Sequence, residues 1–149
     1  MLLLDTSAAS AFMRRRPDAL RRLREQDPST VYLCAPVAAE INFGLSRLPP
    51  ESRRRRLLAN EFRRLRAAVR WTDWNEAATR AFGHWKAALQ RRGTPIEDID
   101  LAIASIALSL PAQLATANVR HFERIDDLDI ADWSGPGRQG TSPGRPRRA

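Results

Sequence analysis

The sequence predicts an α/β domain whose central sheet is mainly parallel. Short apolar runs alternate with amphipathic helical segments along residues 1–133, an order that is typical of parallel strands joined by crossover helices. Apolar residues make up 43% and charged residues 28% of the 149, which is the composition of a globular protein. We therefore expect one domain over 1–133, followed by a flexible basic tail over 134–149 that is rich in Gly, Pro and Arg.

The first half of the chain predicts two strands and three helices. Residues 1–4 are apolar and stop at an aspartate, as a buried strand does. Hydroxyl residues then cap a helix over 6–14, and a proline starts a second helix over 17–27. A second strand covers 31–35. The helix that follows, over 36–48, has apolar residues at steps of three and four.

The second half continues the alternation. Residues 51–69 form a long amphipathic helix with many arginines, and 69–74 form a third strand. The helix over 75–93 is capped by an asparagine and ended by a glycine. Residues 99–109 are almost wholly apolar, which predicts a central buried helix. Short strands on either side of a helical turn then cover 113–116 and 128–131.

The positive charge of the chain is concentrated in two segments. Its 25 basic residues outnumber its 17 acidic ones, which gives a net charge of +8. Residues 53–70 hold eight Arg and one Glu, a net charge of +7, and the tail adds four Arg, so the other residues together carry −3. Arginine presents a planar fork that suits phosphate, and the charge therefore predicts an acidic partner such as nucleic acid.

The composition also excludes several classes of protein. A single cysteine, Cys34, rules out an internal disulfide framework and fits a reducing compartment. No apolar run approaches the ~20 residues of a membrane span, and the first residues lack the basic region of a signal peptide. Cys34, His84 and His121 stand apart in the sequence, which indicates structural roles rather than a zinc site. We expect a cytoplasmic protein with no membrane partner.

Three carboxylates in apolar surroundings are the candidate site. Asp5 follows the first strand, where α/β sheets place their sites, and it also fits a helix cap. Glu40 lies beside apolar residues of its helix, within that face or at its margin. Asp100 begins an apolar helix, where a buried carboxylate is stabilised by a cation or by the helix dipole. Asp98 fits a capping role at the start of the same helix. Acids from three separate elements predict a divalent cation, and oxygen ligands favour Mg²⁺ or Mn²⁺.

Four segments in order resemble the PIN-domain ribonucleases, in particular the VapC-type toxins of toxin–antitoxin pairs. They read LLLDTSAASAF, PVAAEINFG, PIEDIDLAIASIAL and LATANVRHF. The resemblance implies a three-layer α/β/α fold and a metal-dependent endonuclease site. By position, Asp5, Glu40 and Asp100 match the family's catalytic acids, with Asp5 and Asp100 as the main metal ligands. The resemblance gives supporting roles to Thr6, Thr116 and Asn118, and the last of these stands where many relatives have Asp.

The function that the resemblance implies is that of a toxin that cuts RNA. The expected reaction is Mg²⁺-dependent hydrolysis of phosphodiester bonds, in tRNA or rRNA loops, that leaves a 5′-phosphate; Mn²⁺ is the other candidate cation. Implied partners are a small antitoxin protein and a second copy of the chain in a homodimer. Two roles are open for Arg53, Arg54, Arg55 and Arg56: they hold the RNA backbone, or they form a solvated helix face. Several apolar residues of the early helices either line a groove for the antitoxin or belong to the core; they include Phe12, Leu20, Leu23 and Phe43.

Two other functions fit parts of the pattern. A PIN-like domain with a weakened site would act as an RNA- or partner-binding module, and the amide of Asn118 at an acidic position supports this alternative. An aspartate-nucleophile phosphatase also begins with an aspartate at a strand end. Such enzymes show D-x-D-x-T, however, and here Asp5 is followed by Thr6 and Ser7 without a second aspartate. Metal-dependent RNA cleavage separates the nuclease from both.

Overall fold

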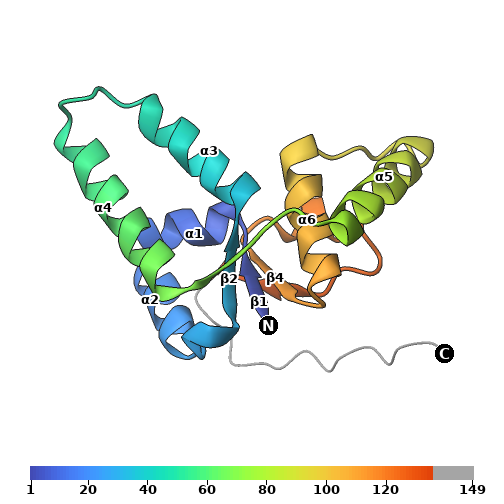
Figure 1. Cartoon of the computed structure of the whole chain (residues 1–149), viewed down its shortest axis with the longest axis horizontal. Helices are drawn as coiled ribbons and strands as arrows, with labels where there is room; N and C mark the ends of the chain where they lie inside the picture. The colour runs from blue at the N-terminus through green and yellow to red at the C-terminus, as the bar shows by residue number, and fades with distance from the viewer. Residues whose placement is uncertain (136–149) are drawn as a thin grey trace.

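The computed structural model describes residues 1–135 and contains one five-stranded sheet (Figure 1). The predicted tail lies outside the described residues from position 136 onwards. The strand order is β3-β2-β1-β4-β5, and every pairing between these neighbours is parallel. The strands are β1 Leu2–Leu4, β2 Val31–Cys34, β3 Arg70–Thr72, β4 Gln113–Thr116 and β5 Ile130–Asp132.

The strand order places β1 at the centre of the sheet. On one side Leu2 pairs with Val31 of β2, and on the other side Leu2 pairs with Gln113 of β4. The chain runs from β1 outwards through β2 to β3, and it then crosses to the other side of β1 to form β4. The direction of winding therefore reverses beside β1, and binding sites of parallel α/β sheets lie at the carboxyl ends of the strands at such a reversal.

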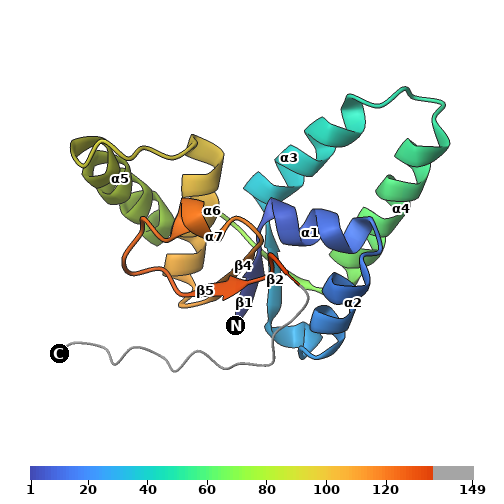
Figure 2. The ribbon, with the colours of Figure 1, turned by 180° about the vertical axis from the view of Figure 1, so that it is seen from behind.

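Helices cover both faces of the sheet, which confirms the three-layer prediction. Figures 1 and 2 show α1, α2 and α4 on one side of the strands and α5 and α6 on the other. A 3₁₀ turn over Pro28–Thr30 precedes β2. The helices are α1 Thr6–Met13, α2 Pro17–Arg24, α3 Ala35–Ser46, α4 Arg53–Ala68, α5 Glu76–Arg91, α6 Asp98–Ser109 and α7 Val119–Phe122.

The core lies between the strands and the helices on either side. Leu3, Leu33 and Leu114 are fully buried, because helices cover both faces of the parallel sheet. The residues of α6 from Leu101 to Ala107 are all buried, which confirms the prediction of a central buried helix. No helix within residues 1–135 is long and apolar enough to cross a lipid bilayer.

The fifth strand is displaced from its predicted position. The sequence predicts a strand over 128–131, whereas β5 covers Ile130–Asp132. The Leu128 N–H donates a hydrogen bond to the Ile125 carbonyl (3.0 Å), which closes a turn before the strand begins. Apolar residues of this turn are buried like those of a strand, so the sequence pattern does not separate the two.

Two glycines of the α5 region allow a direct test of backbone energetics. Gly93 follows α5 with φ of +68°, a left-handed conformation that costs an ordinary residue about 1–2 kcal/mol. Gly83 lies inside α5, and at both positions an added Cβ would meet no atom within 4 Å. We expect Gly93→Ala to lower the free energy of unfolding by about 1 kcal/mol and Gly83→Ala to raise it by about 0.5–1 kcal/mol. Urea titration measures both changes, and a shift of the same sign in the two variants would contradict the expectation.

Candidate active site

Asp5 ends the central strand β1 and caps α1. Its Oδ1 accepts hydrogen bonds from the Ser7 hydroxyl (2.6 Å) and the Ala8 N–H (2.8 Å), and its Oδ2 accepts one from the Thr116 hydroxyl (2.5 Å). The cap of α1 is therefore Asp5, which is one of the two roles that the sequence leaves open for it, and not the hydroxyl residues Thr6 and Ser7. Burial raises the pKa of Asp5, and the hydrogen bonds oppose this rise only in part. An ionised carboxylate has about four acceptor positions, so capping a helix does not by itself prevent Asp5 from binding a cation.

Hydroxyl groups hold the Asp5 carboxylate from two sides. Thr116, at the end of β4, is fully buried, and its Oγ1 also accepts a hydrogen bond from the Asn118 N–H (2.9 Å). The Ser7 Oγ accepts one from the Ala117 N–H (2.9 Å). Asn118 is exposed, and its contact with Thr116 is made by the backbone. The sequence gives no site role to Ser7, and the only signal for one is its position two residues after Asp5.

Glu40 faces this cluster from α3. The Thr6 hydroxyl, in the first turn of α1, donates a hydrogen bond to Glu40 Oε2. Thr6 therefore orients Glu40, whereas Thr116 orients Asp5. Both Thr6 and Glu40 line a cavity of about 170 Å³ between α1, α3 and α4. Its other lining residues include Arg14, Ile41, Leu45, Arg54 and Leu58.

Asp100 lies in the first turn of α6 and completes the group of acids. Its side chain is 26% exposed. Burial is the main reason that the pKa of Asp100 is raised. The negative charges of Glu40 and Asp5 raise this pKa further, while His121 opposes the rise. The three acids predicted from the sequence therefore lie close enough to influence one another electrostatically, although they come from three separate elements.

His121 lies in the same site, although the sequence indicates a structural role for it. Its Nε2 is 2.9 Å from Asp100 Oδ2, and the His121 side chain is 22% exposed. The ring belongs to α7, the short helix that follows β4 and turns back over the start of α6 (Figure 2). The signal for this contact in the sequence is the position of His121 three residues after Asn118, within the segment that already carries a candidate site residue.

The donor set fits a hydrated divalent cation. Carboxylate oxygens are the ligands that Mg²⁺ prefers, and this ion usually binds to one or two carboxylates and keeps several waters. Within residues 1–135, no three His, Cys, Asp or Glu side chains come close enough together to hold one ion directly. Burial raises the pKa of Asp5, and burial together with the charges of Glu40 and Asp5 raises the pKa of Asp100, so both groups are costly to ionise in this site. A cation bound partly through water would lower that cost.

Asp98 lies in the first turn of α6, at the N-terminal end of the helix as the sequence predicts, but its carboxylate forms no capping hydrogen bond. Glu97 is the residue at the cap position of α6, without a side-chain hydrogen bond to the helix. The Asp98 carboxylate points to the neighbouring helix α5, where its Oδ2 is 2.8 Å from Lys86 Nζ. Asp98 also borders an open hollow of about 380 Å³ that His121 lines on its other side.

The four consecutive arginines of the basic segment form the first turn of α4. Arg53, Arg54 and Arg56 are exposed, while the Arg55 guanidinium donates to the Leu48 carbonyl (3.4 Å). Among these four arginines, Arg54 is the one that lines the cavity shared by Thr6 and Glu40. The charged helix and one of the three acids, Glu40, thus meet at one cavity.

Comparison with known proteins identifies the family. The PIN domain matches residues 2–128. The chain belongs to the PIN-domain family. This PIN domain is 47% identical over 60 residues to ribonuclease VapC1 of Haemophilus influenzae, a match that covers 40% of the chain but only 45% of that relative's length. It is 27% identical over 131 residues to the tRNA(fMet)-specific endonuclease VapC of Salmonella typhimurium, covering 88% of the chain and 96% of that relative.

A solved structure shares the fold along almost its whole length. The structure of VapBC2 from Rickettsia felis bound to a DNA fragment from its promoter matches this PIN domain with a TM-score of 0.78 and 25% identity. The match covers 89% of the chain and 98% of the chain in that structure. The sequence resemblance to VapC-type ribonucleases and the predicted fold are both confirmed.

Proposed function

We propose that this PIN domain is a Mg²⁺-dependent endoribonuclease and acts as the toxin of a toxin–antitoxin pair. The observation that carries the proposal is the meeting of Asp5, Glu40 and Asp100 at the carboxyl end of the central strand, with the pKa values of Asp5 and Asp100 raised. Carboxylates that are costly to ionise suit a site that binds a cation together with phosphate. The cation reduces the repulsion among the carboxylates and between them and the phosphate.

Each acid has a separate role in this mechanism. Asp5 and Asp100 hold the cation, directly or through water, and the hydroxyls of Ser7 and Thr116 keep the Asp5 carboxylate in place. Glu40, oriented by Thr6, holds the attacking water or accepts its proton. A cation held by these residues would supply a more acidic water and would neutralise charge on the scissile phosphate. The products are an RNA fragment with a 5′-phosphate and one with a free 3′-hydroxyl.

The substrate is a structured RNA with an unpaired loop. The relative from Salmonella typhimurium acts on tRNA(fMet), and proteins read RNA sequence mainly in unpaired loops. We propose that a tRNA or rRNA loop enters the site and that Arg53, Arg54 and Arg56 face its backbone, because these arginines are exposed beside the cavity that Glu40 lines.

A cleavage assay tests the proposed function. Purified protein should cut tRNA or rRNA in Mg²⁺ or Mn²⁺ and stop cutting in EDTA. The downstream fragment should be ligated without prior phosphorylation, since it carries a 5′-phosphate. Asp100→Asn, purified in the same way, controls for contaminating nucleases. Cleavage that persists in EDTA would contradict the metal-dependent site.

The second candidate function is a binding module without cleavage. The neutral, exposed Asn118 at the fourth acidic position favours it, because an amide adds no charge with which to hold a second ion. Tight RNA binding without any cleavage in Mg²⁺ or Mn²⁺ would select this function over the nuclease.

We expect Arg54 to contribute directly to RNA binding. Each phosphate contact with single-stranded RNA contributes about 0.7 to the slope of the logarithm of affinity against the logarithm of salt concentration. Arg54→Ala should therefore weaken binding at low salt and reduce this slope by about 0.7. Arg91→Ala removes the same charge from the exposed end of α5 and should leave the slope unchanged. Equal slopes for Arg54→Ala and wild type would show that Arg54 does not contact phosphate.

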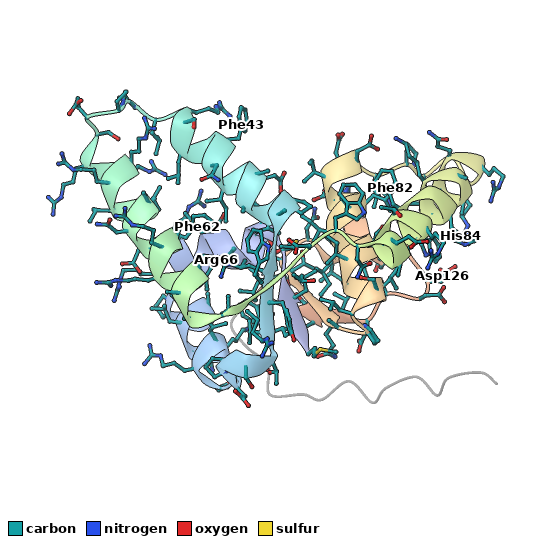
Figure 3. All side chains as sticks on the ribbon, viewed as in Figure 1. Phe43, Phe62, Arg66, Phe82, His84 and Asp126 are labelled. Carbon is teal, nitrogen blue, oxygen red and sulfur yellow. The ribbon has the colours of Figure 1, made fainter. Side chains whose placement is uncertain are left out.

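We further propose a cytoplasmic protein with a small antitoxin and a second copy of the chain as partners. Phe43 is 66% exposed near the end of α3 (Figure 3), so it is available to a partner. Phe12 and Leu23 are partly buried and pack against the core, which favours the core alternative for these two residues. Co-expression with the product of the neighbouring gene, followed by gel filtration, tests both partners.

A further inference from the structure

His121 brings a nitrogen atom to a site that otherwise offers oxygen. The Nε2 atom is buried, and within the described residues it has no hydrogen-bond partner of suitable geometry, although Asp100 Oδ2 is 2.9 Å away. A buried ring nitrogen left without a hydrogen bond is costly, and such an atom calls for a ligand. The two atoms come from separate elements, α7 and α6, and lie at an ion-pair distance from each other.

We propose that His121 is a metal ligand beside Asp100 and that it makes this site prefer Mn²⁺ to Mg²⁺. The proposal rests on the proposed function and adds to it a fourth side chain and a choice of metal. Imidazole nitrogen binds first-row transition metals well, whereas Mg²⁺ is a hard ion that favours oxygen. Replacing one oxygen ligand by nitrogen therefore costs Mg²⁺ more than Mn²⁺.

The distance between the two atoms suits a shared ion. Neighbouring ligands of an octahedral ion with bonds of about 2.1 Å are separated by about 3.0 Å. The 2.9 Å between Nε2 and Oδ2 matches the edge of such an octahedron, so the spacing of the two atoms is compatible with one shared ion. Asp5 and Glu40 then contribute through water, in agreement with the lack of three directly ligating side chains among residues 1–135.

A role for His121 as a competitor of the metal predicts the opposite change in metal affinity. A positively charged His121 that pairs with Asp100 would occupy the place of the cation and compete with it. Removal of the ring would then strengthen the binding of both metals. If His121 is a ligand, removal weakens the binding of both, and that of Mn²⁺ more. The sign of the change in affinity therefore separates the two roles.

The experiment uses the full chain, freed of metal with EDTA and then dialysed. Mn²⁺ binding is followed by electron paramagnetic resonance, with Mg²⁺ as competitor, and pulsed spectra detect coupling of bound Mn²⁺ to ¹⁴N. The variants are His121→Ala and His121→Gln, and the matched control is His84→Ala. His84 is the only other histidine and lies on α5, where its ring contacts Trp85 (Figure 3). Thermal melts confirm that each variant is folded.

We expect wild type and His84→Ala to show ¹⁴N coupling and to prefer Mn²⁺. Both His121 variants should lose the coupling, bind Mn²⁺ at least about tenfold more weakly, and lose most of the preference for Mn²⁺ over Mg²⁺. Absence of ¹⁴N coupling in wild type, its persistence in the His121 variants, or tighter metal binding by them would overturn the proposal. RNA cleavage by wild type under any of these outcomes would leave the nuclease function standing, so the two proposals fail separately.

Discussion

Asp100→Asn is expected to abolish RNA cleavage and to stabilise the metal-free protein at the same time. The amide cannot replace the charge that holds the cation, so the rate should fall by at least about 100-fold. The wild-type carboxylate is partly buried and faces Glu40 and Asp5, which is why its pKa is raised. Removing its charge relieves this repulsion. We expect the midpoint of thermal unfolding in EDTA at pH 7 to rise by about 2–4 °C.

The same pKa shift sets a pH dependence that the variant should lose. The folded protein binds a proton at Asp100 more tightly than the unfolded chain does, because the folded pKa lies above the ordinary value of 3.8. Stability is therefore lost as the pH rises from about that ordinary value through the raised pKa. Asp5, whose pKa is also raised, contributes in the same direction. Asp100→Asn should flatten the fall in metal-free stability between acidic and neutral pH.

The matched control for this prediction is Asp98→Asn. Asp98 lies in the same first turn of α6, but it is exposed and its carboxylate pairs with Lys86 on α5. Its replacement should leave cleavage close to the wild-type rate and should not raise the unfolding midpoint. An Asp100→Asn protein that keeps its activity, or one that melts below wild type in EDTA, would contradict the prediction.

Asp5→Ala is expected to abolish cleavage as well, but with the opposite effect on stability. Asp5 caps α1 and accepts a hydrogen bond from the fully buried Thr116 hydroxyl. Loss of an N-cap and of the partner of a buried hydroxyl should lower the free energy of unfolding by about 1–3 kcal/mol. Urea titration measures this loss, and the cleavage assay measures activity.

Asp5→Asn separates the two roles of this residue. Asparagine is as good a cap as aspartate and keeps an oxygen for the Ser7 hydroxyl and the Ala8 N–H, so stability should stay closer to wild type than in Asp5→Ala. Cleavage should still be lost with the charge. If Asp5→Asn and Asp5→Ala were equally destabilised, the cap would not be the source of the difference.

The sequence predicts those parts of this molecule that depend on local pattern. The apolar run before Asp5 identifies β1, and the apolar run after Asp100 identifies the buried helix α6, because each pattern reflects burial of consecutive residues. Asp5, Glu40 and Asp100 already stand out as carboxylates in apolar surroundings, and the family resemblance then assigns them to one catalytic site. Their mutual influence on the pKa of Asp100 is a property of the folded chain.

The parts that the sequence misses depend on how separate elements pack. The contact of His121 with Asp100 requires α7 to turn back over the start of α6, and nothing in the residues between them specifies that path. The pairing of Thr6 with Glu40 likewise depends on the packing of α1 against α3. Asp98 resembles a cap in the sequence, but Lys86 of α5 draws its carboxylate to the surface.

The hydrogen bond between Thr116 and Asp5 joins residues that are 111 positions apart. A chain that is still being synthesised holds β1 and α1 long before β4 has left the ribosome. Until then the Asp5 carboxylate lacks the Thr116 hydroxyl, and α7 with His121 has not yet formed beside Asp100. The site is thus completed only when nearly the whole domain has been released. In the proposed nuclease, the residues that orient Asp5 and contact Asp100 are therefore among the last of the domain to be made.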